Sequence, residues 1–248
     1  METIKKPEGP IVVNSGKKMM TSVDDLVSSS LRIYKQNFKK FVLMILAGLI
    51  AYLPVYLISA WLSVNTNIVL GVILVILFVL GVLFLIYFGV RSQIGMYLIL
   101  KNPTMDFKKL FIDTKSLFWK FFGLSLLTGI FIFLWTILLI IPGIIFGIFY
   151  SFALYLLVFE GVSGLNAIKR SKALVTGYWW AVFGRTLFLI LIAILLSFVL
   201  SIPFIFFTEG TIIFSIYNLL QSLVWAVVTP VFMVFTYLMY KDLRRIKG

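Results

Sequence analysis

The sequence predicts an all-α, polytopic membrane protein with six transmembrane helices and three interfacial amphipathic helices on its cytoplasmic side. The first observation behind this prediction is composition: 62% of the 248 residues are apolar, 12% are charged, and the mean hydropathy is +1.10. Soluble domains are about half apolar and about a quarter charged, so a water-soluble fold is excluded. The second observation is that the apolar runs are continuous, whereas strands of a membrane barrel would alternate apolar and polar residues.

Six apolar runs are long enough for helices that cross a hydrocarbon core of about 30 Å, which takes about 20 residues. They are Phe41–Val64, Ile68–Val90, Phe121–Ile141, Ile144–Phe159, Trp180–Ser201 and a stretch within Thr211–Tyr240. The chain therefore divides into a disordered cytoplasmic tail (1–20), one six-helix transmembrane domain (21–240) and a C-terminal cytoplasmic tail (241–248).

The positions of the basic residues predict the orientation. All 22 Lys and Arg residues fall in four places: the N-terminal tail, the connection between spans two and three, the connection between spans four and five, and the C-terminus. Cytoplasmic segments are enriched in Lys and Arg, which predicts that both termini are cytoplasmic. The net charge of +13 is then a topology signal, and we expect no nucleic-acid partner. Without a signal peptide, Cys or transit-peptide character, the expected location is a bacterial inner (plasma) membrane.

Three segments beside the spans have apolar residues at helical spacing: Val23–Phe38, Phe107–Phe118 and Ser163–Gly177. The first follows a capping box formed by Ser22 and Asp25. Each segment runs into an aromatic junction, which predicts a quasi-threefold repeat of one amphipathic helix followed by a hairpin of two spans. Two interpretations stay open: the amphipathic helices anchor the hairpins, or they form a collar that binds anionic lipid.

The residue types exclude most catalytic chemistry. The chain has no Cys and no His, which removes disulfides, thiolate nucleophiles, Cys/His zinc sites and catalytic His triads. It has no GxxxxGK[ST] motif for nucleotide hydrolysis, and its nine acids lack the spacing of a calcium loop. We therefore expect a protein that is not an enzyme and has no catalytic residue, cofactor or metal site.

Charged residues near the membrane surface give the first set of candidate site residues. Glu160 ends the fourth predicted span, where an unpaired carboxylate is costly, so a basic partner is expected. Two interpretations remain, a structural ion pair and a site for a lipid headgroup. The candidate partners of Glu160 are Lys169, Arg170 and Arg185, and Lys108, Lys109 and Lys115 are further candidates for binding lipid headgroups.

Two amides in the last predicted span form the second set. Asn218 and Gln221 are one helical turn apart and share one side of the helix. Such amides usually hydrogen-bond neighbouring helices inside the membrane, and a substrate path is the alternative.

One stretch carries a family resemblance. It contains Ile141-Pro142-Gly143, Glu160-Gly161, Ala167-Ile168-Lys169-Arg170-Ser171 and Gly177-Tyr178-Trp179. On these residues the chain resembles the six-span membrane domain fused to some glycerophosphoryl diester phosphodiesterases, and related uncharacterised bacterial inner-membrane proteins. The resemblance implies a six-helix membrane architecture near phospholipid headgroups. It does not imply phosphodiesterase activity, which in those fusions belongs to a separate soluble domain that needs His.

Two functions from different classes follow. The first is a non-enzymatic, lipid-associated scaffold or envelope-homeostasis factor at the cytoplasmic leaflet, with anionic phospholipids as partners. The second is a small facilitator, a channel or the membrane subunit of a transport system, with a polar path near Asn218, Gln221 and Glu160. Either function is compatible with a homo-oligomer or a partner membrane protein. An intramembrane lipid-modifying enzyme ranks last because no acid–base pair lies at membrane depth.

Overall fold

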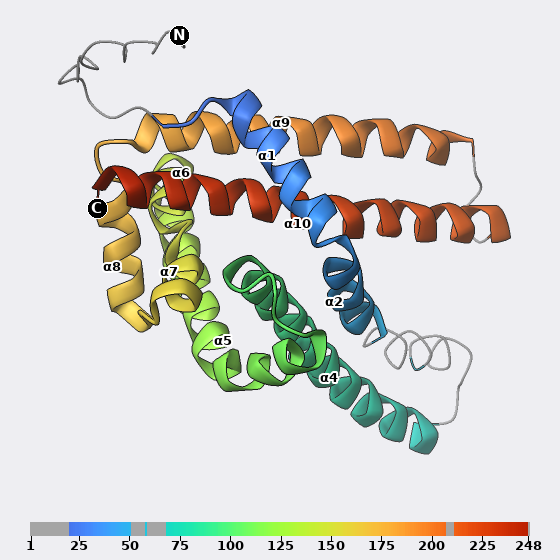
Figure 1. Cartoon of the computed structure of the whole chain (residues 1–248). Coiled ribbons are helices and arrows are strands. Elements are labelled where there is room, and N and C mark those ends of the chain that lie inside the picture. The colour runs from blue at the N-terminus through green and yellow to red at the C-terminus, as the bar shows by residue number, and fades with distance from the viewer. Residues whose placement is uncertain (1–19, 51–57, 59–67, 207–210, 248) are drawn as a thin grey trace, which may run out of the picture.

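The computed structural model describes residues 20–50, 58, 68–206 and 211–247, and this described part contains helices and no strand (Figure 1). The helices are α1 (Val23–Gln36), α2 (Phe38–Ile50), α4 (Ile68–Lys101), α5 (Phe107–Leu138), α6 (Ile140–Tyr150), α7 (Ala153–Glu160), α8 (Gly164–Val175), α9 (Trp179–Ser201), the 3-10 turn η1 (Ile202–Ile205) and α10 (Ile212–Lys247). The prediction of an all-α fold is confirmed for these residues. Helix α10 includes most of the predicted C-terminal tail, because it continues to Lys247.

Five stretches of the described chain are long and apolar enough to cross a membrane. They are Leu70–Lys101, Phe107–Leu138, Ile140–Glu160, Trp179–Ile205 and Ile216–Lys247. These stretches match the second to the sixth predicted spans and give the chain the character of a multi-pass membrane protein. The first predicted span, Phe41–Val64, falls mostly outside the described residues, as does the predicted tail 1–20 except for Met20.

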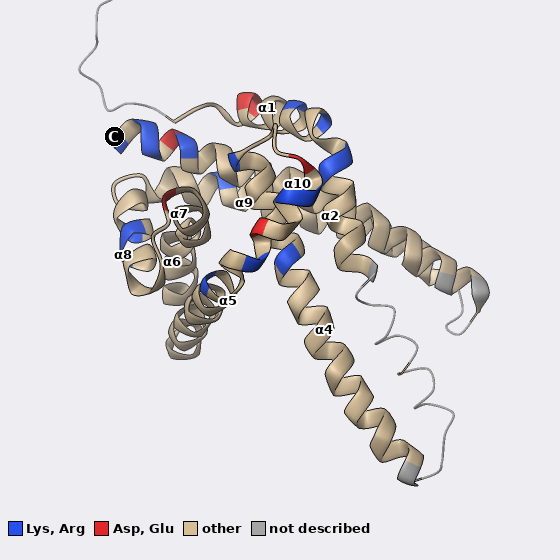
Figure 2. Cartoon of the chain, turned by 60° about the horizontal axis from the view of Figure 1, so that its bottom comes forward, with Lys and Arg blue, Asp and Glu red and all other residues tan. Residues whose placement is uncertain are grey.

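The helices form three arms that diverge from a shared base. Helix α2 packs on α4, α5 on α6, and α9 on α10, and the arms separate with distance from the base (Figures 1 and 2). Figure 2 shows the Lys and Arg positions gathered on the base, while most of the length of the arms carries no charge. We call this shared region the base: α1, α7, α8, the ends of α4 and α10, and the start of α5.

Most of the buried core lies in the base and in the parts of the arms that adjoin it. Its residues include Ile99 of α4, Leu110 of α5, Leu157 of α7 and Leu243 of α10, each at most 1% exposed. In α9, by contrast, Val182 is the only described residue that is buried. The outer apolar faces of the arms are therefore not covered by the described part of this chain.

The predicted threefold repeat is not confirmed. In the second unit, the amphipathic segment and the span form one uninterrupted helix, α5, from Phe107 to Leu138. Residues 117–121 at the predicted boundary contain no Gly, Pro or capping residue, so nothing in the sequence ends a helix there. In the third unit the two helices are separate, because Gly177 adopts a φ of 85° that favours glycine and ends α8.

Much of the apolar face of α1 and of α8 packs on other helices, although Leu31 and Leu165 are exposed. Leu26 of α1 packs in one buried cluster with Met239 and Leu243 of α10. Helix α8 also packs on α6 and α7. It buries Ala167, Ile168, Ser171 and Val175. The prediction that α1 and α8 are interfacial helices is therefore not confirmed, because the buried residues of both helices pack on other helices.

The fourth predicted span is a discontinuous helix. Helix α6 ends at Tyr150 and α7 begins at Ala153. The fully buried Ser171 hydroxyl of α8 accepts a hydrogen bond from the Phe152 amide at 3.2 Å and donates one to the Phe149 carbonyl at 2.7 Å. A break in a membrane helix needs such partners, because lipid offers none to free backbone groups. Ser171 therefore fixes both the break and the position of α8.

We expect Ser171→Ala to lower the apparent melting temperature in detergent, measured by tryptophan fluorescence. The substitution leaves the buried Phe152 amide unpaired, which costs about 1–3 kcal/mol. The matched control is Ser163→Ala, since Ser163 is exposed and its side chain makes no capping hydrogen bond. Equal melting temperatures for the two variants would show that the Ser171 hydroxyl does not hold the break.

Candidate functional site

Glu160, the last residue of α7, is held by three side chains from two other helices. A terminal guanidinium nitrogen of Arg170 lies 2.9 Å from its Oε2, and Nε of Arg244 lies 3.1 Å from its Oε1. The Tyr240 hydroxyl donates to Oε1 at 2.7 Å. The Glu160 side chain is 8% exposed, whereas both arginine side chains are 57% exposed. We call these four residues the Glu160 clamp; it joins α7, α8 and α10.

Local backbone geometry and aromatic packing place the clamp. Gly161, with a φ of 74°, ends α7 and turns the chain toward α8, which carries Arg170. Tyr240 and Arg244 are one turn apart on α10 and share a face. The rings of Tyr155 and Tyr240 stack with centroids 5.6 Å apart, which sets the Tyr240 hydroxyl beside Glu160. The clamp is therefore the polar end of an aromatic contact between α7 and α10.

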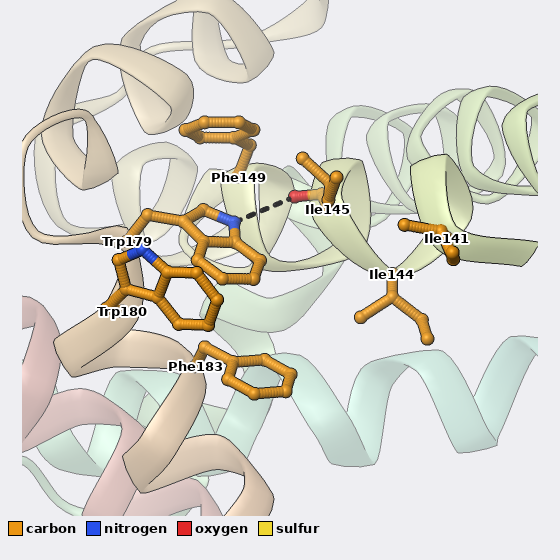
Figure 3. Close-up of a pocket in the computed structure, with 7 residues that line it drawn as sticks. All are labelled: Ile141, Ile144, Ile145, Phe149, Trp179, Trp180 and Phe183. Atoms are coloured by element: carbon orange, nitrogen blue, oxygen red, sulfur yellow. Dashed lines mark hydrogen bonds between the residues drawn. The ribbon is translucent and has the colours of Figure 1, made fainter.

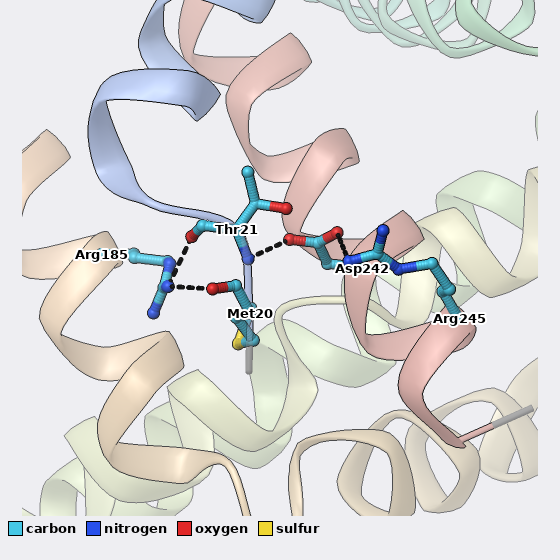
Figure 4. Close-up of polar contacts among 5 residues, drawn as sticks. All are labelled: Met20, Thr21, Arg185, Asp242 and Arg245. Carbon is cyan, nitrogen blue, oxygen red and sulfur yellow. Dashed lines mark hydrogen bonds and ion pairs between the residues drawn. The ribbon is translucent and has the colours of Figure 1, made fainter. Parts of the chain in front are cut away.

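A second polar network holds the residues that precede α1 (Figure 4). The Asp242 carboxylate of α10 accepts from the Thr21 amide at 2.8 Å and pairs with Arg245 at 3.2 Å. Arg185 of α9 donates to the carbonyls of Thr21 and Met20, at 2.6 and 3.4 Å. The chain entering α1 is therefore fastened between α9 and α10.

Arg91 of α4 is a buried cation that binds neutral groups of α5. Its side chain donates to the Thr114 hydroxyl at 2.8 Å and to the Phe111 carbonyl at 2.6 Å. Its guanidinium carbon also lies 4.1 Å from the centre of the Phe111 ring. The residue is 9% exposed, so its charge joins α4 to α5 and is not presented at the surface.

Three lysines have a similar joining role. Lys40 donates to the Met105 carbonyl at 2.8 Å. Lys101 and Lys247 donate to the carbonyls of Val158 and Thr176, each at 2.6 Å. Each of these bonds connects parts of the chain at least 57 residues apart. Part of the positive charge that marks orientation in the sequence therefore also holds the base together.

The structure pairs Glu160 with only one of its three expected partners, Arg170. Lys169 is exposed and makes no ion pair within the described residues, and Arg185 belongs to the Asp242 network. Lys108, Lys109 and Lys115 are exposed on α5. None of these three ammonium groups has a hydrogen bond or ion pair to another described residue.

The predicted polar path is not confirmed. Asn218 donates to the Phe214 carbonyl of its own helix at 3.0 Å, and Gln221 is half-buried one turn further on. Asn218 and Tyr240 of the Glu160 clamp are 22 residues apart on α10, which corresponds to about 33 Å of helix. The two amides therefore lie well away from Glu160, along the length of α10.

Four side chains of the Glu160 clamp and the Asp242 network were not expected from the sequence: Tyr240, Asp242, Arg244 and Arg245. Apart from the local pair of Asp242 and Arg245, their partners are 80 or more residues away in the chain. One signal was present in the sequence, because Asp242 is the single acid after Glu209 and stands among four basic residues. Such an acid indicates a specific partner rather than a general surface charge.

The site offers no acid–base pair for catalysis. Both carboxylate oxygens of Glu160 are occupied by cationic or hydroxyl donors. Within the described ranges, no three His, Cys, Asp or Glu side chains come together to hold a metal ion. The arrangement can join helices and present guanidinium groups at the surface.

The fold and these networks define a class: an all-helical membrane-type protein whose base is joined by charged side chains. Comparison with protein-family models, curated proteins and solved structures finds no match to this chain. The resemblance to the membrane domain of glycerophosphoryl diester phosphodiesterases therefore stays a prediction.

We expect Glu160→Ala to destabilise the base more than Arg170→Ala or Arg244→Ala does. Loss of one exposed arginine costs about 0–1 kcal/mol, whereas loss of Glu160 leaves two neighbouring guanidiniums without their counter-charge. Melting of each variant in detergent measures the effect. Asp113→Ala is the control, since Asp113 makes no ion pair in the part of the chain described. If Glu160→Ala melts at the same temperature as Asp113→Ala, the Glu160 clamp does not stabilise the base.

We expect Asp242→Ala to expose the Thr21 amide to hydrogen exchange by at least tenfold. A hydrogen bond to a charged acceptor contributes about 1.5–3 kcal/mol, and tenfold corresponds to about 1.4 kcal/mol. Exchange mass spectrometry of the peptide spanning Met20 and Thr21 measures it. Arg245→Ala is the matched control because it removes the other partner of Asp242 and leaves the Thr21 bond in place. Equal exchange in both variants would show that Asp242 does not fasten this segment.

Proposed function

We propose that this protein is a non-enzymatic, lipid-associated scaffold that gathers anionic phospholipid at its base. The observation that carries the proposal is a set of exposed lysines on α5 that have no partner among the described residues: Lys108, Lys109 and Lys115. Each such charge near an anionic membrane surface contributes about 1 kcal/mol of attraction. Their ammonium groups are free for phosphate, unlike that of Lys101, which donates to a backbone carbonyl.

The residues that follow on α5 support a position at the headgroup layer. Trp119 is 76% exposed and stands where the charged start of α5 gives way to its apolar part. Tryptophan is enriched at that depth because its ring is apolar and its N–H is polar. The exposed guanidiniums of Arg170 and Arg244 add positive charge to the same base.

The proposal places the base at the cytoplasmic leaflet of a bacterial inner membrane, with both termini on that side. The gathering of Lys and Arg on the base supports this orientation (Figure 2). The uncovered faces of the arms leave room for lipid, a second copy or a partner membrane protein. The transport alternative is weaker, because Asn218 donates to a carbonyl of its own helix and Glu160 is engaged by Arg170, Arg244 and Tyr240.

We expect the triple change Lys108→Gln, Lys109→Gln and Lys115→Gln to reduce the preference for anionic lipid. Three charges at about 1 kcal/mol each correspond to at most roughly a hundredfold change in relative affinity. Native mass spectrometry from nanodiscs of mixed phosphatidylglycerol and phosphatidylcholine measures the ratio of retained lipids. The matched control replaces the same three lysines with arginine, which keeps the charge. An unchanged lipid ratio in the glutamine variant would overturn the proposal.

A further inference from the structure

Helices α6 and α9 bound an apolar groove of about 500 Å³ (Figure 3). Its α6 wall includes Ile141, Ile144 and Phe149, and its α9 wall includes Trp179 and Phe183. We call it the α6–α9 groove. Both walls belong to stretches that can cross a membrane, Ile140–Glu160 and Trp179–Ile205. The groove therefore faces a region where acyl chains are the surrounding material.

Specific contacts set the spacing between the two walls of the groove. The Trp179 ring stacks on Phe183 with centroids 5.0 Å apart and planes 8° from parallel. Its indole N–H donates to the Ile145 carbonyl of α6 at 3.3 Å, which sets the distance between the two helices. Trp180 packs edge-on against both rings and is 77% exposed, so it forms an outer edge (Figure 3). The groove is therefore a built surface and not a gap between loosely packed helices.

A cation lies beside Phe149, one of the residues that line the groove. The Lys172 ammonium of α8 lies 5.5 and 5.7 Å from the ring centres of Phe146 and Phe149, a cation–π distance. Phe149 is the lining residue of α6 closest to α7 and the base, and Ile141 is about 12 Å further along the helix. Lys172 is exposed and has no ion pair to another described residue. The groove thus combines an apolar trough with a positive charge at its base end.

We propose that the α6–α9 groove binds one anionic phospholipid, with its phosphate at Lys172 and an acyl chain along the apolar walls. This inference rests on the proposed function and assigns it a particular site. The walls offer no polar side chain apart from the indole N–H groups, and that of Trp179 is already bonded to Ile145. The complementary molecule is an amphiphile with an anion at one end and an apolar chain of about 12 Å or more.

The first test compares Lys172→Gln with Lys169→Gln. Both lysines are exposed on α8 and carry the same charge, but only Lys172 contacts a ring that lines the groove. Native mass spectrometry in phosphatidylglycerol nanodiscs, with increasing detergent, measures the lipid that is released last. We expect the wild type and Lys169→Gln to keep one phosphatidylglycerol and Lys172→Gln to keep at least fivefold less. Equal retention in both variants would overturn the site.

The second test fills the groove. Ile144→Trp places a large side chain on the α6 wall, and Ile194→Trp is its control on a 59% exposed position of α9 outside the groove. We expect only Ile144→Trp to lose the last phosphatidylglycerol. Retention by Ile144→Trp would show that no acyl chain lies in the groove. Release of the lipid by added inorganic phosphate, or a groove occupied by a second copy in a dimer, would likewise overturn the proposal.

Failure of the site and failure of the general function give different results. If Lys172→Gln and Lys169→Gln lose lipid equally while the α5 lysines still set the lipid ratio, the attraction is diffuse. The proposed function then stands and the groove site fails. If substitution of the α5 lysines and substitution of Lys172 both leave the retention of phosphatidylglycerol unchanged, the proposed function and the groove site both fail.

Discussion

Lipid tails are as apolar as leucine, so burial of apolar surface cannot by itself fix how the helices of this protein meet. Polar contacts at the base supply that specificity. Over eight residues, Tyr240–Lys247, helix α10 binds Glu160, the Thr21 amide and the end of α8. The rest of the architecture depends on these joints, because the arms beyond them expose most of their side chains.

The basic residues serve two purposes that look alike in the sequence. Some, such as Arg91 and Lys101, donate to groups of other helices inside the base and are not free for a ligand. Others, such as Lys108 and Lys172, are exposed and make no ion pair to another described residue. The distinction depends on the partner of each nitrogen and not on the residue type. A count of Lys and Arg indicates orientation but overestimates the charge available to lipid.

The sequence predicted the helical class and five of the spans because long apolar runs have one simple physical interpretation. The sequence could not predict what covers the apolar face of an amphipathic helix. The spacing of apolar residues in α1 is compatible with packing on lipid and with packing on α10. The sequence predicted Arg170 beside Glu160 because the two residues are close in the chain, with only the start of α8 between them. Arg244 of α10 lies 84 residues after Glu160 in the chain, and only the packing of α7 on α10 brings the two side chains together.

The contact between Thr21 and Asp242 spans 221 positions of the chain, which sets the order in which the molecule can be completed. Synthesis is N-terminal first, so the earlier helices are made before the residues of α10 that join them exist. Until α10 has been made, Glu160 lacks Tyr240 and Arg244, and the Thr21 amide lacks the Asp242 carboxylate. Assembly of the base is therefore a late event in the folding of this chain.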